Sequence, residues 1–149
     1  MHSVVVLNLS SPILIGIYEN SKLIKTIQSE EKTSEILGTL FEDILQKYKL
    51  ENIIYIKGPG SFMAIKIAYI FLKTISIVKG IKLFAADAFY FNDNSPIKAV
   101  GKLFFVKESD EITTKVYEQT PTSKFTLPII LNINDFSNNI EPEYSIDSV

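Results

Sequence analysis

The sequence contains no cysteine, no arginine and no tryptophan, and its single histidine, His2, follows the first methionine. Without cysteine there is no disulfide framework, no thiolate zinc site and no cysteine nucleophile. With one histidine, a Ser/His/Asp triad or a histidine-rich zinc site is nearly excluded as well. We therefore expect no catalytic residue, no bound metal and no cofactor.

The lack of arginine removes the planar fork that pairs with phosphate groups and guanine edges. All 15 basic residues are lysines, and 17 acidic residues outnumber them, which gives a net charge of −2. A protein that binds nucleic acid alone usually presents a basic surface. We therefore expect weak binding of free RNA, so that any RNA contact depends on a partner.

Long apolar runs are also absent. Residues 4–7 are too few for the core of a signal peptide. The longest apolar stretch, residues 65–78, is interrupted by Lys66 and Lys73 and is shorter than the roughly 20 residues that span a bilayer. The sequence therefore predicts a cytoplasmic protein that does not contact membranes.

The chain does contain a regular succession of strand and helix patterns, and 46% of its 149 residues are hydrophobic. This composition predicts one compact domain or two lobes that share a core. Residues 4–9, 13–18 and 23–28 read as three antiparallel strands. A helix then begins at Thr33 or Ser34, which are plausible N-caps, with Glu35 in its first turn.

Residues 53–56 form a short apolar strand that leads into a glycine-rich segment. A second helix is predicted from Phe62 to Lys79, ending at Gly80, and residues 81–85 read as a strand parallel to 53–56. The order β-β-β-α-β-α-β indicates a mixed α/β fold. It is the order of half an actin-like, sugar-kinase-like or ribonuclease-H-like domain.

The pattern changes after residue 99. Residues 102–106 and 113–118 flank an acidic turn, Glu108-Ser109-Asp110-Glu111, and predict a β-hairpin. Residues 127–133 are a candidate for one more strand, and residues 134–149 read as a poorly ordered or draped tail. We therefore divide the chain into a first lobe, residues 1–92, and a reduced, β-rich second lobe, residues 93–149.

The segment between the fourth strand and the second helix permits two interpretations. Glycines let the backbone approach a phosphate, and the following helix presents N–H groups, so this is a possible anion-binding or nucleotide-proximal loop. The alternative, which the residues alone favour, is a tight turn with Ser61 as the N-cap. No Walker A sequence follows. The loop consists of Gly58, Pro59, Gly60, Ser61 and Phe62.

Three further groups of side chains are candidate sites. Asn8 ends the first strand, where a carboxylate would hold a metal in actin-like ATPases and ribonuclease-H-like nucleases, and an amide substitutes poorly for it. Asp87 follows the last strand of the first lobe, and we expect it to cap a turn. The carboxylates of Glu108, Asp110 and Glu111 lack the glycine of a calcium loop and predict a solvated hairpin edge.

Aromatic side chains gather after residue 83 without interleaved basic residues. A base-stacking platform is one possible role, but we expect burial between the two lobes. The residues are Phe84, Phe89, Tyr90, Phe91, Phe104 and Phe105.

The apolar arc of the second helix is too wide for a helix that packs only on a sheet. At about 100° per residue, one side suits the sheet; it consists of Ala64, Ile67, Ala68, Phe71, Ile75 and Val78. A neighbouring strip mixes apolar residues with lysines, which cannot be buried unpaired; it consists of Met63, Lys66, Ile70, Lys73 and Ile77. We therefore expect this strip to contact a partner helix. The alternative is that the second lobe covers it.

The glycine-rich segment, followed by Met63-Ala64-Ile65-Lys66, resembles the GPGSFTGxRIG segment of the TsaB (YeaZ) family at the same strand-to-helix junction. Leu7-Asn8-Leu9-Ser10 is similar to the family's IDTS-type first hairpin. The match covers about residues 1–92, and the second lobe is shorter than the family's. Asn8 replaces an acidic residue, and Lys66 replaces an arginine.

This resemblance implies an actin-like, ribonuclease-H-like (ASKHA) lobe with a truncated second lobe. It implies a non-catalytic scaffold subunit of the tRNA threonylcarbamoyladenosine modification complex, which binds the catalytic subunit TsaD alongside the ATPase TsaE. It also implies contact with tRNA only through the complex, and pairing of first-lobe helices with TsaD or in a homodimer. The alternatives are a minimal actin-like or sugar-kinase-like ATP-binding enzyme and a ribonuclease-H-like nuclease, which needs about three or four carboxylates.

Overall fold

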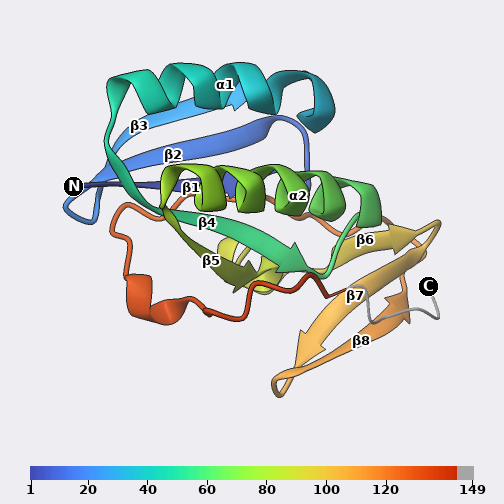
Figure 1. The fold of residues 1–149 in the computed structure, drawn as a ribbon. Coiled ribbons are helices and arrows are strands. Elements are labelled where there is room, and N and C mark those ends of the chain that lie inside the picture. Colours follow the sequence, from blue (N-terminus) through green and yellow to red (C-terminus); the bar gives the residue numbers. More distant parts are fainter. Residues whose placement is uncertain (144–149) are drawn as a thin grey trace.

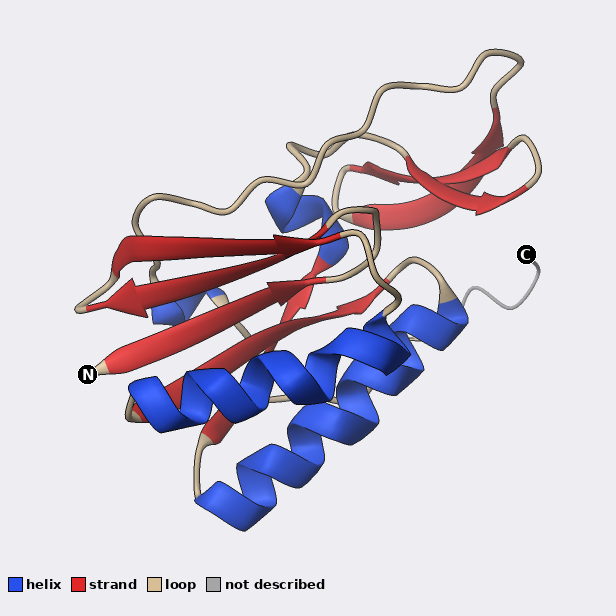
Figure 2. Ribbon diagram, turned by 90° about the horizontal axis from the view of Figure 1, so that it is seen from above, coloured by secondary structure: helices blue, strands red, loops and turns tan. Residues whose placement is uncertain are grey.

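A computed structural model describes residues 1–143 and shows a mixed α/β fold (Figures 1 and 2). The elements follow in the order β1 (His2–Leu7), β2 (Ile13–Glu19), β3 (Lys22–Ser29), α1 (Thr33–Lys47), β4 (Leu50–Gly58), α2 (Phe62–Lys79), β5 (Lys82–Asp87), the 3-10 helix η1 (Ala88–Phe91), β6 (Ile97–Val100), β7 (Leu103–Glu108), β8 (Glu111–Val116) and the 3-10 helix η2 (Ile133–Asp135). The predicted order through β5 is confirmed.

The large sheet has five strands in the order β3-β2-β1-β4-β5. The pairs β1–β2 and β2–β3 are antiparallel, whereas β1–β4 and β4–β5 are parallel. Each parallel pair is joined by a connection that contains a helix, as parallel pairing requires. The prediction that the strand around residues 53–56 runs parallel to the strand that follows α2 is confirmed.

Both long helices lie on the same side of the large sheet (Figure 1). Glu35 lies in the first turn of α1, as predicted, but the N-cap is Lys32, whose side chain makes no cap bond, so the expected cap at Thr33 or Ser34 is wrong. The reason is that Thr33 already has helical geometry and is buried. Gly80 ends α2 in the left-handed conformation (φ 69°), which glycine adopts without steric cost.

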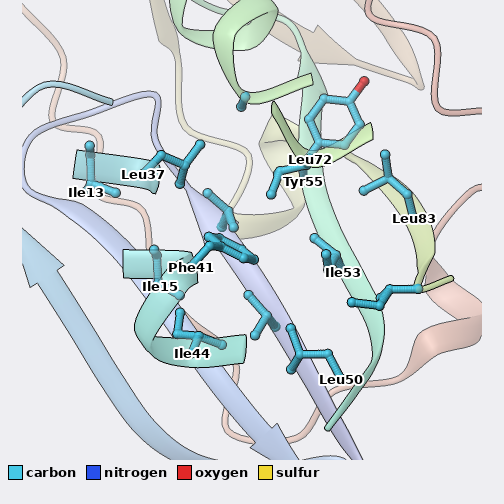
Figure 3. Packing of buried hydrophobic residues seen from close by; sticks show 14 of the residues in the cluster. Ile13, Ile15, Leu37, Phe41, Ile44, Leu50, Ile53, Tyr55, Leu72 and Leu83 are labelled. Atoms are coloured by element: carbon cyan, nitrogen blue, oxygen red, sulfur yellow. The ribbon is translucent and has the colours of Figure 1, made fainter. Parts of the chain in front are cut away.

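The core between the helices and the sheet is built from alternate strand residues and one stripe of each helix (Figure 3). Leu37, Phe41 and Ile44 of α1 are buried there, as are Ile15 and Ile53 of the sheet. The rings of Phe41 and Phe71 meet edge to face with centroids 5.6 Å apart, which joins α1 to α2.

The inward face of α2 differs from the predicted one. Ile65, Ala68 and Leu72 are buried against the sheet. Val78 was expected on the same side, but it is 70% exposed, so that prediction is wrong. The buried residues of α2 follow one another at spacings of three and four positions. Val78 lies about 120° around the helix from the centre of this buried stripe.

A second, three-stranded antiparallel sheet has the order β6-β7-β8. The predicted hairpin is confirmed, and Ser109 and Asp110 adopt positive φ angles of 50° and 65° in its turn. Two such residues give the tight turn that suits the twist of a hairpin. β6 was not predicted as a strand. It has four residues, and its pairing with β7 shifts register between Lys98 and Val100.

The second half of the chain covers the other face of the large sheet. Val5 and Ile54 point to that face and pack in a second cluster with Phe105, Phe125 and Leu131. Strands covered on both faces read as continuous apolar runs, which is why β1 and β4 contain Val4-Val5-Val6 and Ile53-Ile54. The two halves of the chain therefore share a core.

The aromatic residues after position 83 are mostly buried, as predicted. Phe89, Phe91, Phe104 and Phe105 are buried, and Phe84 is half-buried. Tyr90 is 42% exposed, contrary to the expectation. Its hydroxyl donates to Asp135 at 2.8 Å, and burial of the ring together with this bond raises the pKa of Tyr90 to about 12.

Residues 127–133 do not form a strand, so that prediction is wrong, although Ile130 makes an isolated antiparallel bridge to Lys22. Farther on, the backbone of Ser137 exchanges two hydrogen bonds of 2.9 Å with Ala85 on β5. The tail was predicted to be either poorly ordered or draped, and residues 134–143 are draped along the protein. Residues 144–149 of that prediction lie outside the described residues.

Candidate functional site

The carboxyl ends of the parallel strands β1, β4 and β5 meet at one edge of the large sheet. Asn8 follows β1, Gly58 ends β4, and Asp87 ends β5, where it is the register partner of Gly58. In α/β proteins, ligands bind most often in the crevice beyond these ends. This edge is therefore the candidate site, and it brings together three of the groups that the sequence singled out: Asn8, the glycine-rich loop and Asp87.

Asn8 links the beginnings of both long helices. Asn8 is buried, with only 6% of its surface exposed. Its Nδ2 donates to the carbonyl of Ala64 at 2.9 Å and to Thr33 Oγ1 at 3.4 Å. Oδ1 has no hydrogen-bond partner within residues 1–143. A carboxylate has no proton to donate to these acceptors. The amide at this position therefore serves to hold the two helices on β1.

Both carboxylate oxygens of Asp87 accept hydrogen bonds from the protein itself. One oxygen accepts from the backbone N–H of Phe89 at 2.8 Å, and the other accepts from Lys107 Nζ at 2.9 Å. The expected cap role is confirmed, and the hydrogen bond to Asp87 raises the pKa of Lys107. No group of three or more histidine, cysteine, aspartate or glutamate residues in the described chain is placed to hold a metal ion.

The two glycines of the loop fit against neighbouring protein atoms. Gly58 has φ 142°, and an added Cβ would lie 2.8 Å from the carbonyl oxygen of Glu143. At Gly60, an added Cβ would lie 2.7 Å from Leu9 Cδ1. Ser61 is the N-cap of α2 and accepts from the N–H of Ala64 at 3.4 Å. This geometry is that of a close-packed turn, and the anion-binding role remains a prediction.

The end of the described chain lies against this loop. The N–H of Glu143 donates to the carbonyl of Lys57 at 2.7 Å, and the two side chains form an ion pair with 3.4 Å between Nζ and Oε1. The Tyr55 hydroxyl donates to the carbonyl of Ile140. Residues 140–143 thus cover the carboxyl end of β4, a contact that no local sequence pattern indicates.

A cleft of about 840 Å³ opens beside the loop, between the large sheet and the small one. Its walls include Leu9 and Ser10 after β1, the loop and the start of α2 (59–63), and the strand region 96–100. Phe104, Phe105 and Phe125 complete an apolar lining. This volume is within the range of small-molecule and cofactor sites. The sequence did not predict the cleft, because its walls come from segments more than 100 residues apart.

The predicted strip of α2 lies at the surface. Met63, Ile70 and Ile77 are 58%, 55% and 71% exposed, which confirms the expectation drawn from the neighbouring lysines. Lys73 is half-buried and donates to the Tyr69 hydroxyl at 3.0 Å, which raises its pKa. The alternative, in which the second lobe covers the strip, does not hold for residues 93–143.

No described helix has the length and hydropathy needed to cross a lipid bilayer.

Neither a family model nor a curated protein sequence matches the chain. Among solved structures, YeaZ from Pseudomonas aeruginosa aligns with a TM-score of 0.60 at 10% identity, over 82% of this chain and 66% of that one. An uncharacterized protein with similarity to peptidase YEAZ from Pseudomonas aeruginosa gives a TM-score of 0.56 at 11% identity, over 83% and 66%. The chain therefore spans just under two thirds of the length of both structures. The resemblance to YeaZ is thus confirmed in three dimensions, as a likeness of fold.

Proposed function

We propose that the chain is a TsaB-type scaffold subunit of the tRNA threonylcarbamoyladenosine modification complex, with no catalytic activity of its own. In this proposal it is a cytoplasmic protein with an ASKHA first lobe (1–92) and a reduced second lobe (93–149). It binds a TsaD-like catalytic subunit, in a complex that includes a TsaE-like ATPase, and contacts tRNA only through that complex. The likeness of fold to YeaZ and the outer face of α2 support the proposal.

The observation that carries the proposal is the apolar row on α2. Met63, Ile70 and Ile77 repeat every seven residues and cover about 21 Å of helix. A helix that only packs on a sheet has polar residues on its outer side. Apolar residues that recur every seven positions are typical of a helix that packs lengthwise against another helix. The row therefore suits a partner helix, either on a TsaD-like subunit or on a second copy of this chain.

The state of the polar side chains supports an accessory role. Asn8 donates to Ala64 and Thr33, and Asp87 caps η1 and pairs with Lys107. An enzyme that uses ATP and magnesium needs carboxylate oxygens for the ion. Both residues at the carboxyl edge are instead engaged in holding the fold, so the proposal places the chemistry on the partner.

Co-expression of the chain with the TsaD-like protein of the same cell tests the proposal. We expect the pair to co-purify, and Ile70→Glu to abolish co-purification while circular dichroism shows an unchanged fold. Thr39→Glu is the matched control, because Thr39 is exposed on α1, and it should leave the pair intact. A complex that survives Ile70→Glu, or no complex with the unaltered chain, would contradict the proposal.

A further inference from the structure

The edge of β6 faces the apolar cleft. Five consecutive residues, 96–100, line the cleft, as do residues 59–63. Side chains of a strand alternate between the two faces of its sheet. A lining by consecutive residues indicates that the edge of the strand, with its backbone, is turned toward the cleft. The cleft therefore presents a strand edge as well as apolar side chains.

This edge has no backbone partner in the described chain. β6 is an outer strand of the small sheet and pairs only with β7, and no further backbone hydrogen bond within residues 1–143 involves residues 97–100. The large sheet differs, because both of its edges receive backbone bonds. Leu23 donates to the carbonyl of Ile129, and Ala85 exchanges two bonds with Ser137. An open strand edge is a template for pairing with another chain.

The cleft also contains one uncompensated charge. Lys98 and Glu143 are its charged residues, and Glu143 is paired with Lys57. Lys98 is exposed and forms no ion pair within the described residues. The remaining lining is apolar or carries hydroxyl groups. An occupant with apolar side chains and one carboxylate would complement this surface.

We propose that the cleft binds an extended segment of a partner protein, which adds to β6 as a fourth strand of the small sheet. Main-chain bonds to residues 97–100 give the segment its extended shape, and alternate apolar side chains enter the cleft. A carboxylate on the segment lies opposite Lys98. This site shares Met63 with the apolar row of α2 but not Ile70 or Ile77, so Ile70→Glu tests the α2 proposal and Lys98→Glu tests this one.

The test is a selection of eight-residue random peptides on the full-length chain, followed by titration of the selected peptides. We expect enrichment of alternating apolar residues with one acidic residue. Lys98→Glu should weaken binding at least fivefold, whereas Lys25→Glu should not. Lys25 is the matched control, because it is an exposed lysine on β3 without an ion pair in the described residues.

Methylation of single peptide nitrogens separates strand addition from other modes of binding. We expect a loss of about fivefold at alternate positions, the effect of one missing hydrogen bond, and little loss at the positions between them. Octanoate, an apolar anion without a peptide backbone, should not displace the peptide. The proposal is overturned if no peptide is enriched, if methylation has no alternating effect, if Lys98→Glu matches Lys25→Glu, or if octanoate competes fully.

Discussion

The helices α1 and α2 lie on the same face of the same sheet, yet their outer sides differ. The outer side of α1 carries Ser34, Glu35, Thr39, Glu42 and Gln46, all exposed and polar. The corresponding side of α2 carries Met63, Ile70, Ile77 and Val78, all more than half exposed. Because both helices meet the same core, packing explains their inner sides alone. Packing within the described monomer therefore does not account for the difference between their outer sides.

α1 serves as an internal control for the outer side of α2. α1 shows that the sheet is covered adequately by a helix with a polar outer side, as expected for a surface helix. The apolar outer side of α2 is thus not needed to close the core, which is already filled by Ile65, Ala68 and Leu72. Exposed apolar rows of this kind are typical of interaction surfaces.

The strongest contrast is expected between the two sides of α2 itself. Leu72 is 0% exposed, so Leu72→Glu buries an unpaired carboxylate and should lower the free energy of unfolding by more than about 5 kcal/mol, enough to unfold the monomer. Circular dichroism would show loss of helix signal. Ile70→Glu, two residues away on the outer side, should retain it. Equal unfolding of both variants would mean that the strip belongs to the core.

Asn8 holds both helices, so Asn8→Asp should affect them together. The introduced carboxylate faces the carbonyl of Ala64 and cannot donate to it, which should cost about 3–5 kcal/mol at neutral pH. Burial raises the pKa of the introduced carboxyl in the folded state. The variant therefore recovers stability below the ordinary pKa of aspartate and loses it as the pH rises through the raised value.

Urea unfolding at pH 4 and pH 7 measures this dependence. Asn92→Asp is a useful reference, because Asn92 is also buried but contacts Ser95 and Ser123, away from both helices. The Asn92→Asp variant should lose stability, but the ratio of hydrogen-exchange protection in α1 to that in α2 should not change. An Asn8→Asp variant as stable at pH 7 as the unaltered chain would disprove the tethering role.

The two helices also differ at their ends, since glycine adjoins only α2. Gly60→Ala should cost about 2 kcal/mol, because Gly60 has φ 158°, which residues with a Cβ rarely adopt, and the new Cβ meets Leu9 Cδ1 at 2.7 Å. At Gly80 nothing lies within 4 Å of an added Cβ, so Gly80→Ala should cost only about 1 kcal/mol for the positive φ. Thermal unfolding of both variants measures the difference. A larger loss at Gly80 would contradict the close packing of Leu9 against the loop.

The smallest effect on stability is expected from making α2 resemble α1. Replacing Met63, Ile70 and Ile77 with glutamine should change the free energy of unfolding by less than about 0.5 kcal/mol per position, because all three are exposed. Solubility should rise, and light scattering should show a monomer that no longer binds its partner. A substantial fall in melting temperature would mean that the row stabilises the monomer.

Local patterns were sufficient to predict the elements that repeat over several turns or residues. The apolar spacing of α1, the end of α2 at Gly80 and the hairpin around Ser109-Asp110 all follow from neighbouring residues. β6 was not predicted, because a strand of four residues with an irregular register is too short to show an alternation of apolar and polar residues. The bridge at Ile130 escaped because one pair of residues has no periodicity.

The site was harder to predict than the fold. As sequence, Gly58 and Gly60 permit an anion-binding loop and favour a tight turn, and only the positions of Glu143 and Leu9 show how closely the turn is packed. The same is true of Asp87, whose partner Lys107 lies 20 residues away. Side chains that meet only after folding carry no local signal, so the cleft and its charge could not be derived from the sequence.

The two backbone contacts of residues 129–137 have a consequence for biosynthesis. These residues bond to β3 at Leu23 and to β5 at Ala85, the opposite edges of the large sheet. At 5–20 residues per second, the ribosome takes roughly 3–10 s to proceed from β5 to Ser137. During that interval the nascent sheet has two unpaired edges and an uncovered apolar face, so this is the stage at which chaperones would be needed most.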